Sequence, residues 1–373
     1  MKMLSTVSMA ALLVATASPS RLFAQNAFAP PPPNTAACAP ENGLKFVCGV
    51  RSAEDETLIP GTRWIIASGK LSGEGVKLVD TDAKTEQLFY TGAPAQMRPD
   101  KKLYPNCPAP LDPKSFVAHG LYLRAASTSG RYNLYVVSHG TLESIEVFGV
   151  DTRGPQPSLT WTGCVPMPEG DNKSNGVAAF SDGTIITTLE ERPGTTIVQE
   201  LNGEPVGDVL EWKPGMNSFH PIPGTQLAGD NGIEISPDES EFYVVAYGTR
   251  SIAVFSRKDP SKPLRSTVAP GFTPDNLRWS GERLLAAGPV YDDPACGGTP
   301  SQARANPSKG RCNRGYVVAQ LDPKTMTWSI VAYAESASEI GAVSTGVIAG
   351  STLWIGANFA EGLAYRPLPG AGR

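Results

Sequence analysis

Short runs of β-branched and aromatic residues, separated by polar turns, recur along the chain. Six units can be distinguished, and in most of them a second run follows the first after a turn. Runs of this length and composition predict β-strands. They occupy residues 63–67 and 76–79, 134–137 and 144–148, 184–188, 242–246 and 252–255, 283–287 and 316–319, and 352–355 and 362–365.

The spacing of these units indicates their arrangement. Successive units lie roughly 40 to 70 residues apart, which is enough for a four-stranded sheet each. No long stretch shows the 3.6-residue period of an amphipathic helix. The pattern therefore predicts an all-β fold, a six-bladed β-propeller with four-stranded antiparallel blades around a central tunnel. A large β-sandwich or two small ones is the alternative, and the regular count of six favours the propeller.

Composition narrows the class of partner. The chain holds 38 Gly and 34 Pro, as expected where many short strands are joined by turns. Only 18% of its residues are charged and the formal net charge is −4. No run of Lys or Arg is present, so a nucleic-acid partner is not expected.

The first 40 residues indicate export. Lys2 precedes an apolar run at 9–17, and cleavage after Ala17 or Ala24 fits a signal peptide over residues 1–24. That run is too short to cross a bilayer, so no transmembrane segment is expected after cleavage. An uncleaved or lipid-anchored N-terminus is the alternative. Residues 25–40 form a proline-rich linker, the propeller spans 41–373, and the expected location is secreted or periplasmic.

Cysteine usage agrees with an oxidising compartment. An even number of cysteines in an exported chain suggests disulfides, although sequence alone cannot choose the pairing. Cys296 and Cys312 flank a Gly-, Pro-, Ser- and Arg-rich insert, which predicts a local bond between them. No C-x-x-C motif occurs, which disfavours a metal–thiolate site. The six cysteines are Cys38, Cys48, Cys107, Cys164, Cys296 and Cys312.

Acidic and amide residues precede four of the predicted blades. The chain has no G-x-S-x-G, H-E-x-x-H or Walker A motif. Positions just before the inner strands of a propeller converge on its tunnel. Carboxylate and amide oxygens suit Ca²⁺, and they suit zinc or copper poorly. Taken singly, each residue also fits an ordinary turn former. The candidates are Glu54, Asp55, Asn175, Asn231, Asp275 and Asn276.

Two of the three histidines lie on neighbouring strands of the predicted second blade. His119 ends the segment 116–119, and His139 ends the run 135–138. Such a pair can act as a proton relay in which one imidazole orients the other. The alternative is two ordinary half-buried histidines.

Several segments in order resemble the paraoxonase/arylesterase family, within the wider group of gluconolactonase, regucalcin and strictosidine-synthase-like propellers. The likeness runs from about residue 48 to residue 366. It is carried by residues 52–60 (SAEDETLIP), 116–120 (FVAHG), 135–139 (YVVSH), 231–238 (NGIEISPD), 274–276 (PDN), 343–346 (VSTG), 353–356 (LWIG) and 362–365 (GLAY).

The resemblance implies a calcium ion in the tunnel and assigns its ligands. His119 matches the proposed general base of the family, and His139 matches its partner. The residues that match the family's calcium ligands are Glu54, Asn175, Asn231, Asp275 and Asn276.

The chain departs from the family at two places. The paraoxonases place an acid after the residue matched by Asn175, where it helps to bind a second calcium, and this chain has Gly176. Asp55 matches another ligand of that second ion, whose presence is left open. The family also joins its two ends by a disulfide. Cys48 could be the N-terminal half of such a bond, but no cysteine follows Cys312.

The expected function is that of an exported calcium-dependent hydrolase of lactones or (aryl)esters. The metal would polarise the carbonyl of a small-molecule substrate, and an activated water would attack it. One alternative is a non-catalytic, calcium-braced propeller that binds a small ligand or a protein partner. Another is a different reaction, such as a strictosidine-synthase-like condensation. Loops around 219–220 and within 296–312 are expected to shape the tunnel mouth.

Overall fold

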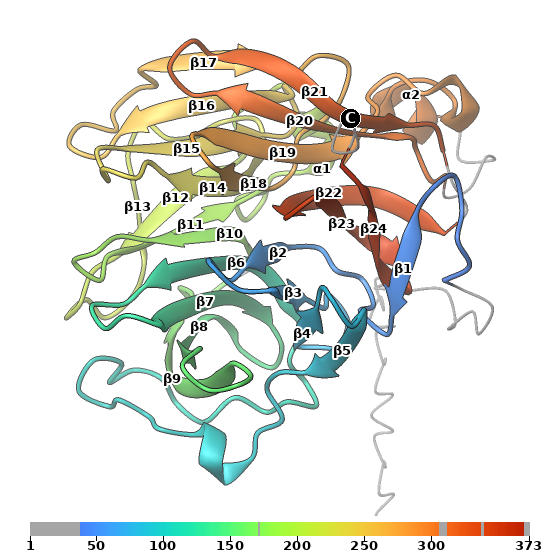
Figure 1. Cartoon of the computed structure of the whole chain (residues 1–373). Helices are drawn as coiled ribbons and strands as arrows, with labels where there is room; N and C mark the ends of the chain where they lie inside the picture. The colour runs from blue at the N-terminus through green and yellow to red at the C-terminus, as the bar shows by residue number, and fades with distance from the viewer. Residues whose placement is uncertain (1–37, 171, 306–311, 337–338, 369–373) are drawn as a thin grey trace, which may run out of the picture. The chain divides into compact units, whose positions relative to one another are not determined.

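Six four-stranded antiparallel sheets form a ring, as the computed structural model of the protein shows (Figure 1). The structure describes residues 38–170, 172–305, 312–336 and 339–368, all within the unit that spans 33–373. The predicted six-bladed propeller is confirmed. The predicted signal peptide and most of the proline-rich linker lie outside the described residues.

The blades follow one another along the chain. From the innermost strand outward they are, in blade 1, β2 (Glu56–Leu58), β3 (Trp64–Ser68), β4 (Val76–Asp80) and β5 (Thr85–Leu88); in blade 2, β6 (Ala118–Ala125), β7 (Arg131–His139), β8 (Glu143–Asp151) and β9 (Ser158–Pro166); in blade 3, β10 (Ser174–Ala179), β11 (Ile185–Leu189), β12 (Asp208–Trp212) and β13 (His220–Pro221); in blade 4, β14 (Asp230–Ile235), β15 (Glu241–Ala246), β16 (Ser251–Ser256) and β17 (Arg265–Val268); in blade 5, β18 (Leu277–Ser280), β19 (Arg283–Pro289), β20 (Tyr316–Asp322) and β21 (Thr327–Ala334); and in blade 6, β22 (Ile340–Ala349), β23 (Thr352–Ala360), β24 (Gly362–Pro367) and β1 (Lys45–Cys48).

The ring is closed by an N-terminal strand. β1 pairs antiparallel with β24, so that Lys45 lies opposite Tyr365 and Cys48 opposite Gly362. Blade 6 is therefore built from both ends of the propeller. This arrangement removes a free sheet edge from the last blade and ties the first described strand to the last.

Apolar layers between successive blades make up the core. Ile66 of blade 1 and Phe148 of blade 2 belong to one buried cluster with Phe116. The rings of Phe116 and Phe148 stack with centroids 6.2 Å apart. The middle strands of a blade are covered on both faces, which explains why they read as continuous apolar runs.

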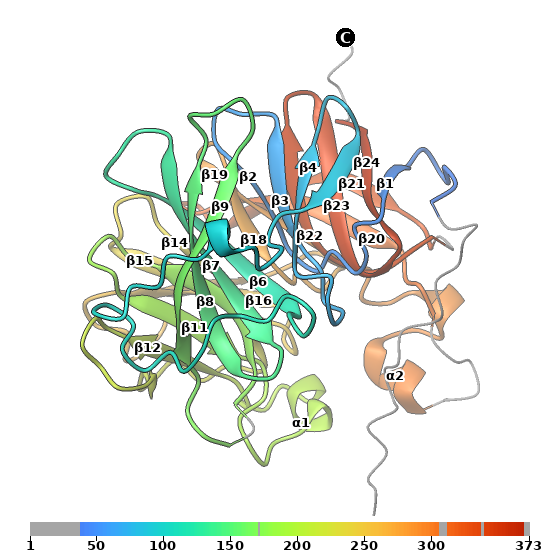
Figure 2. The same ribbon diagram turned by 90° about the horizontal axis from the view of Figure 1, so that it is seen from below.

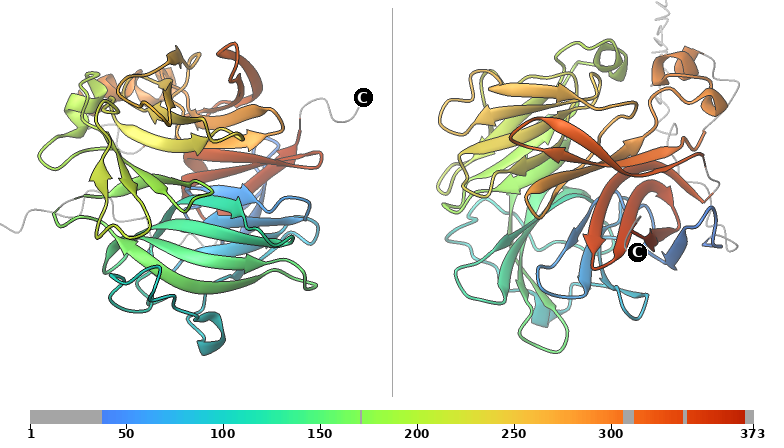
Figure 3. Two further views of the ribbon diagram at one scale, coloured as in Figure 1. Left: turned by 90° about the vertical axis from the view of Figure 1, so that its left-hand side faces the viewer. Right: turned by 45° about the horizontal axis from the view of Figure 1, so that its top comes forward.

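Helical structure in the described residues is short and partly gathered at one end of the propeller. Helices α1 (Ile197–Leu201) and α2 (Pro300–Ala305) lie side by side there, as Figures 2 and 3 show. The 3₁₀ turns are η1 (Pro94–Gln96) and η2 (Pro294–Cys296). Within the described part of the chain, no helix has the length and apolarity needed to cross a bilayer.

Two disulfides are present in the described residues. Cys296 is bonded to Cys312, which confirms the predicted local bond and closes the insert that carries α2. Cys107 is bonded to Cys164 and fastens the loop before blade 2 to strand β9. Cys38 and Cys48 are not disulfide-bonded.

Candidate functional site

The inner strands of blades 2, 3 and 4 share a backbone irregularity where they reach the tunnel. Each has a β-bulge that contains a polar residue followed by glycine: His119 and Gly120 in β6, Asn175 and Gly176 in β10, and Asn231 and Gly232 in β14. A bulge re-aims the side chain that it contains. The three predicted site residues therefore point to the tunnel for one common reason.

The glycine of each pair lies against the next blade. A Cβ on Gly120 would fall 2.3 Å from the carbonyl oxygen of Asn175, and one on Gly232 would fall 2.3 Å from that of Asp275. Gly176 abuts the carbonyl oxygen of Asn231 in the same way, at 2.9 Å. No side chain fits at these contacts. The repeated polar–Gly pair is a sequence signal of the site that becomes visible only when the three segments are compared with one another.

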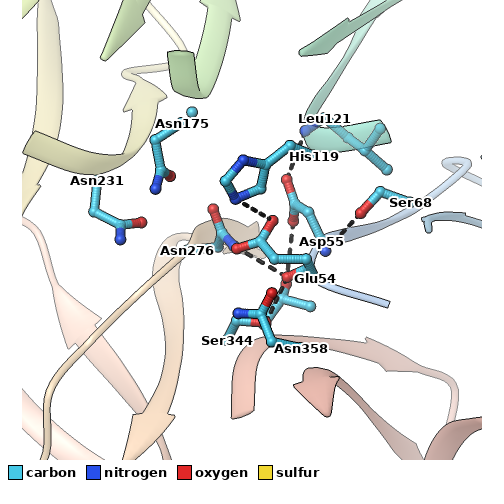
Figure 4. A network of polar contacts seen from close by, with 12 residues as sticks. Glu54, Asp55, Ser68, His119, Leu121, Asn175, Asn231, Asn276, Ser344 and Asn358 are labelled. Atoms are coloured by element: carbon cyan, nitrogen blue, oxygen red, sulfur yellow. Dashed lines mark hydrogen bonds and ion pairs between the residues drawn. The ribbon is translucent and has the colours of Figure 1, made fainter. Parts of the chain in front are cut away.

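A cavity of about 210 Å³ lies where the inner strands converge. Figure 4 shows side chains from all six blades around it, including Glu54, His119, Asn175, Asn231, Asn276 and Ser344. Helices α1 and α2 cover it from one end. Its lining comprises Glu54, Lys70, His119, Asn175, Glu190, Ile197, Leu201, Asn231, Tyr247, Asp275, Pro300, Arg304 and Asn358.

Four buried oxygens at this cavity have no hydrogen-bond partner among the described residues. They are Oε2 of Glu54, Oδ1 of Asn175, Oδ1 of Asn231 and Oδ1 of Asp275. A buried polar atom without a partner costs free energy, roughly 1–3 kcal/mol for each group. Four of them facing one small space indicate a group that is bound there and supplies positive charge.

Glu54 is held rigidly while one of its oxygens stays free. Its backbone oxygen accepts hydrogen bonds from Ser344 Oγ at 2.6 Å and from Asn276 Nδ2 at 3.2 Å. Asn276 Nδ2 also donates to Glu54 Oε1 at 2.9 Å. The amide nitrogen of Asn276 is thus committed to Glu54, which leaves only its amide oxygen for a cation.

Glu190 joins the site although its sequence context does not single it out. It directly follows β11, and its carboxylate accepts hydrogen bonds from Asn175 Nδ2 at 3.3 Å and from Asn231 Nδ2 at 3.4 Å. Its place after a buried strand that ends at the tunnel was the available signal.

The electrostatics of the site reflect crowded, desolvated carboxyl groups. Burial raises the pKa of Asp275 well above its usual range, and the nearby charges of Glu54 and Glu190 raise it further. Burial also raises the pKa of Glu54, against the opposing charge of Lys70 and the hydrogen bond from Asn276. A bound cation would favour the ionised form of these groups.

The two predicted histidines form a hydrogen-bonded chain with a third residue. His119 Nδ1 lies 2.7 Å from His139 Nε2, and His139 Nδ1 lies 2.7 Å from Oε1 of Glu143. A second cavity of about 390 Å³, lined in part by both histidines, adjoins the first through shared residues such as Lys70 and Glu190. Glu143 could not be selected from the sequence, because nothing local marks it as a partner of His139.

The hydrogen-bond chain fixes the protons on both rings. Because the carboxylate of Glu143 accepts a proton at His139 Nδ1, His139 Nε2 must accept one from His119 Nδ1. His119 Nε2 is then an acceptor; it is buried at the cavity, 3.3 Å from Glu54 Oε2. Burial lowers the pKa of His119 well below its usual value, which agrees with a neutral ring.

Asp55 turns away from the cavity toward a buried arginine. Arg278 Nη2 forms an ion pair with Asp55 Oδ2 and donates to the carbonyl oxygen of Leu121 at 2.7 Å. Arg278 Nε donates to the carbonyl oxygen of Glu56 at 3.0 Å. A guanidinium therefore occupies the position next to Asp55 where the resemblance placed a second calcium.

The remaining sequence predictions are placed as follows. Pro300 and Arg304, within the insert closed by Cys296 and Cys312, line the central cavity. The other expected rim segment does not: His220 is exposed on β13, the outermost strand of blade 3. Among the described residues, no group of three or more His, Cys, Asp or Glu side chains is placed to hold a metal ion, so a cation site here must include the asparagine amides.

Solved structures share this fold. A gluconolactonase of Xanthomonas campestris aligns with a TM-score of 0.52 over 87% of this chain and 89% of its own, at 15% sequence identity. A luciferin-regenerating enzyme aligns with a TM-score of 0.51 over 88% of this chain and 95% of its own, at 14% identity. The likeness of the fold to gluconolactonase-type propellers is thereby confirmed, and identities this low establish the fold alone. No family model and no curated protein matches the chain.

Proposed function

We propose that the protein is an exported, calcium-dependent hydrolase of lactones or aryl esters. The observation that carries the proposal is the set of four unpartnered buried oxygens, each from a different blade, that face one cavity. Two are carboxylate oxygens and two are amide oxygens. This is the donor chemistry that Ca²⁺ prefers, with its six to eight oxygen ligands.

The residues that would hold the ion are Glu54, Asn175, Asn231 and Asp275, together with the amide oxygen of Asn276. When bound, calcium would supply Lewis-acid polarisation of a carbonyl oxygen. Because Asp55 is paired with Arg278, we propose one calcium ion per chain. Two disulfides among the described residues support export to an oxidising compartment.

The histidine chain supplies the base in this proposal. His119 Nε2 is the unprotonated nitrogen at the cavity, positioned to take a proton from an attacking water. His139 holds the His119 ring in this tautomer, and Glu143 holds His139 in turn. A positive charge that forms on the histidine pair is stabilised by the Glu143 carboxylate. Such a chain favours catalysis over simple ligand binding.

Two substitutions test the assignment. Asp275→Asn removes one of the two carboxylates with a free oxygen, and we expect calcium affinity and lactone hydrolysis to fall together. His119→Gln should slow hydrolysis at least tenfold while calcium stays bound, since a general base contributes about 10²–10⁴-fold. Asp82→Asn is the matched control, because the Asp82 side chain is 79% exposed. Full activity in a metal-free Asp275→Asn protein would exclude the proposal.

A further inference from the structure

We propose that Glu190 is a positioning residue that sets the orientation of both amide ligands. The inference rests on the proposed calcium site and names a residue that neither the sequence motifs nor the resemblance assigns to it. Glu190 reaches the amide groups of two blades with its two oxygens: Oε2 accepts from Asn175 in blade 3, and Oε1 accepts from Asn231 in blade 4.

An asparagine amide has one acceptor end and one donor end of nearly equal size. Only the oxygen end can bind a cation, so the orientation of the amide decides whether the residue is a ligand at all. A carboxylate can only accept hydrogen bonds, so it draws the Nδ2 end of each amide toward itself. The opposite end, Oδ1, is then left buried and unpartnered in both residues, as the structure shows.

Other acceptors do not serve this purpose at the two amides. The hydrogen bonds that the structure assigns to the side-chain nitrogens of Asn175 and Asn231 both go to Glu190. Glu54 is engaged by Asn276 instead. A single carboxylate between two blades therefore fixes half of the four free oxygens.

A glutamine at position 190 would break this arrangement without changing its size. Its carbonyl end can still accept from one amide, but its NH₂ end attracts the oxygen of the other. That amide would then present a nitrogen to the cavity. Changes to residues that orient metal ligands typically weaken metal affinity by roughly 10- to 100-fold, and we expect Glu190→Gln to fall in this range.

The experiment separates orientation from charge. Calcium affinity is measured by isothermal titration calorimetry for the full chain, with the calcium-induced rise in unfolding temperature as a second readout. In Glu190→Gln/Asn231→Asp, a carboxylate replaces an amide; both of its ends are oxygen, so no orientation is needed. Asn358 lines the same cavity, and Glu190→Gln/Asn358→Asp therefore restores the charge without restoring the orientation.

We expect affinity to be lost in Glu190→Gln, largely regained with Asn231→Asp, and not regained with Asn358→Asp. Affinity within twofold of wild type in Glu190→Gln, or equal rescue by the two double variants, would overturn the inference. Failure of the wild-type chain to bind calcium would instead refute the proposed function, and it is read from the wild type alone.

A separate observation concerns the two cysteines outside the disulfides. Cys48 ends β1 opposite Gly362 of β24, and its exposed thiol is hydrogen-bonded to that of Cys38. A Cβ on Gly362 would fall 2.9 Å from Cys38 Sγ and 3.2 Å from the Cα of Cys48. The missing side chain of this glycine leaves room for the two cysteines to meet at the closure of blade 6.

We infer that Cys38 and Cys48 form a third disulfide that secures the closing strand. The two thiols together lose two protons and two electrons as the S–S bond forms. A low-molecular-weight disulfide, such as oxidised glutathione, accepts them and leaves as two thiols after passing through a mixed disulfide. Cys48 is the exposed partner and is therefore open to the oxidant.

Alkylation and peptide mapping test this inference. The purified full chain is equilibrated with oxidised glutathione, denatured, alkylated and digested. We expect no alkylated cysteine, a linked Cys38–Cys48 peptide, and a higher unfolding temperature than before oxidation. The Cys38→Ser variant should keep one alkylated cysteine and show no such rise. Two alkylated cysteines in the wild type, with the other two disulfides intact, would contradict the inference.

Discussion

Arg278 of blade 5 forms a buried ion pair with Asp55 of blade 1, and the same guanidinium also binds the carbonyl oxygen of Leu121 in blade 2. The protein thus supplies a cation of its own beneath the candidate calcium site. Burial raises the pKa of Asp55 to about 7 even though the charge of Arg278 acts to lower it. The arginine therefore stabilises a carboxylate that would otherwise hold a proton, and it joins three blades.

Loss of this arginine should strongly destabilise the propeller. Arg278→Met leaves Asp55 buried without its partner, and breaking a buried pair costs about 3–5 kcal/mol. Adding Asp55→Asn removes the orphaned charge, so the double variant should recover much of the loss. Chemical denaturation at pH 7.5 without calcium measures both. A single variant within 1 kcal/mol of wild type would contradict the structural importance of the pair.

The second link of the histidine chain can be tested separately. In Glu143→Gln the side chain still accepts a hydrogen bond from His139 but no longer carries charge. On the proposed mechanism we expect the turnover number to fall about tenfold, with KM and calcium affinity unchanged. The matched control is Glu169→Gln at an exposed acid. Unchanged turnover would show that the chain is not used in catalysis.

The close approach of neighbouring blades predicts a sensitive glycine. Gly232→Ala would place a methyl group 2.3 Å from the carbonyl oxygen of Asp275, which must then move. We expect a loss of roughly 1–3 kcal/mol in unfolding free energy and weaker calcium binding, because Asp275 is displaced. Gly149→Ala is the control, since its nearest atom would be 3.9 Å away. Equal stability of the two variants would refute the proposed role of the polar–Gly pairs.

A buried acid remote from the site predicts a pH dependence of stability. Burial raises the pKa of Glu146 from 4.5 to about 7, although hydrogen bonds from Ser144 and Trp161 oppose the shift. Between these values the folded protein holds a proton that the unfolded chain has released. The contribution of Glu146 to stability is therefore complete below pH 4.5 and is lost as pH rises to about 7.

Urea denaturation from pH 4 to 8 measures this effect in Glu146→Gln. Relative to this variant, the wild type should lose up to roughly 3 kcal/mol across the range. The exposed acid variant Glu282→Gln should follow the wild type. Parallel pH profiles for the wild type and Glu146→Gln would contradict the shifted pKa.

The fold was predictable where burial dominates the sequence. The middle strands, such as β15 with its run of Tyr243, Val244 and Val245, are covered on both faces and read as apolar runs. Outer strands such as β5 (TEQL) are partly exposed and polar, and they gave no signal. The closing strand β1 was also not predicted, since its pairing with β24 joins opposite ends of the chain.

The candidate site divides in the same way. Glu54, Asn175 and Asn231 stand just before or within the start of inner strands, and their position along the chain placed them at the tunnel. Glu190 and Arg278 act through contacts at long sequence separation: Glu190 meets Asn231 across 41 residues, and Arg278 meets Asp55 across 223. Single motifs cannot reveal such contacts, because they depend on how the blades are arranged in the ring.

The most direct test is hydrolysis by the purified mature chain of γ- and δ-lactones, phenyl acetate and a gluconolactone, with calcium, after EDTA, and after calcium is restored. We expect activity on at least one of these substrates that disappears with EDTA and returns with calcium. Activity that persists in EDTA, or no hydrolysis of any substrate by a chain that still binds calcium, would contradict the proposed function; the second result would indicate a propeller that uses calcium for binding or bracing alone.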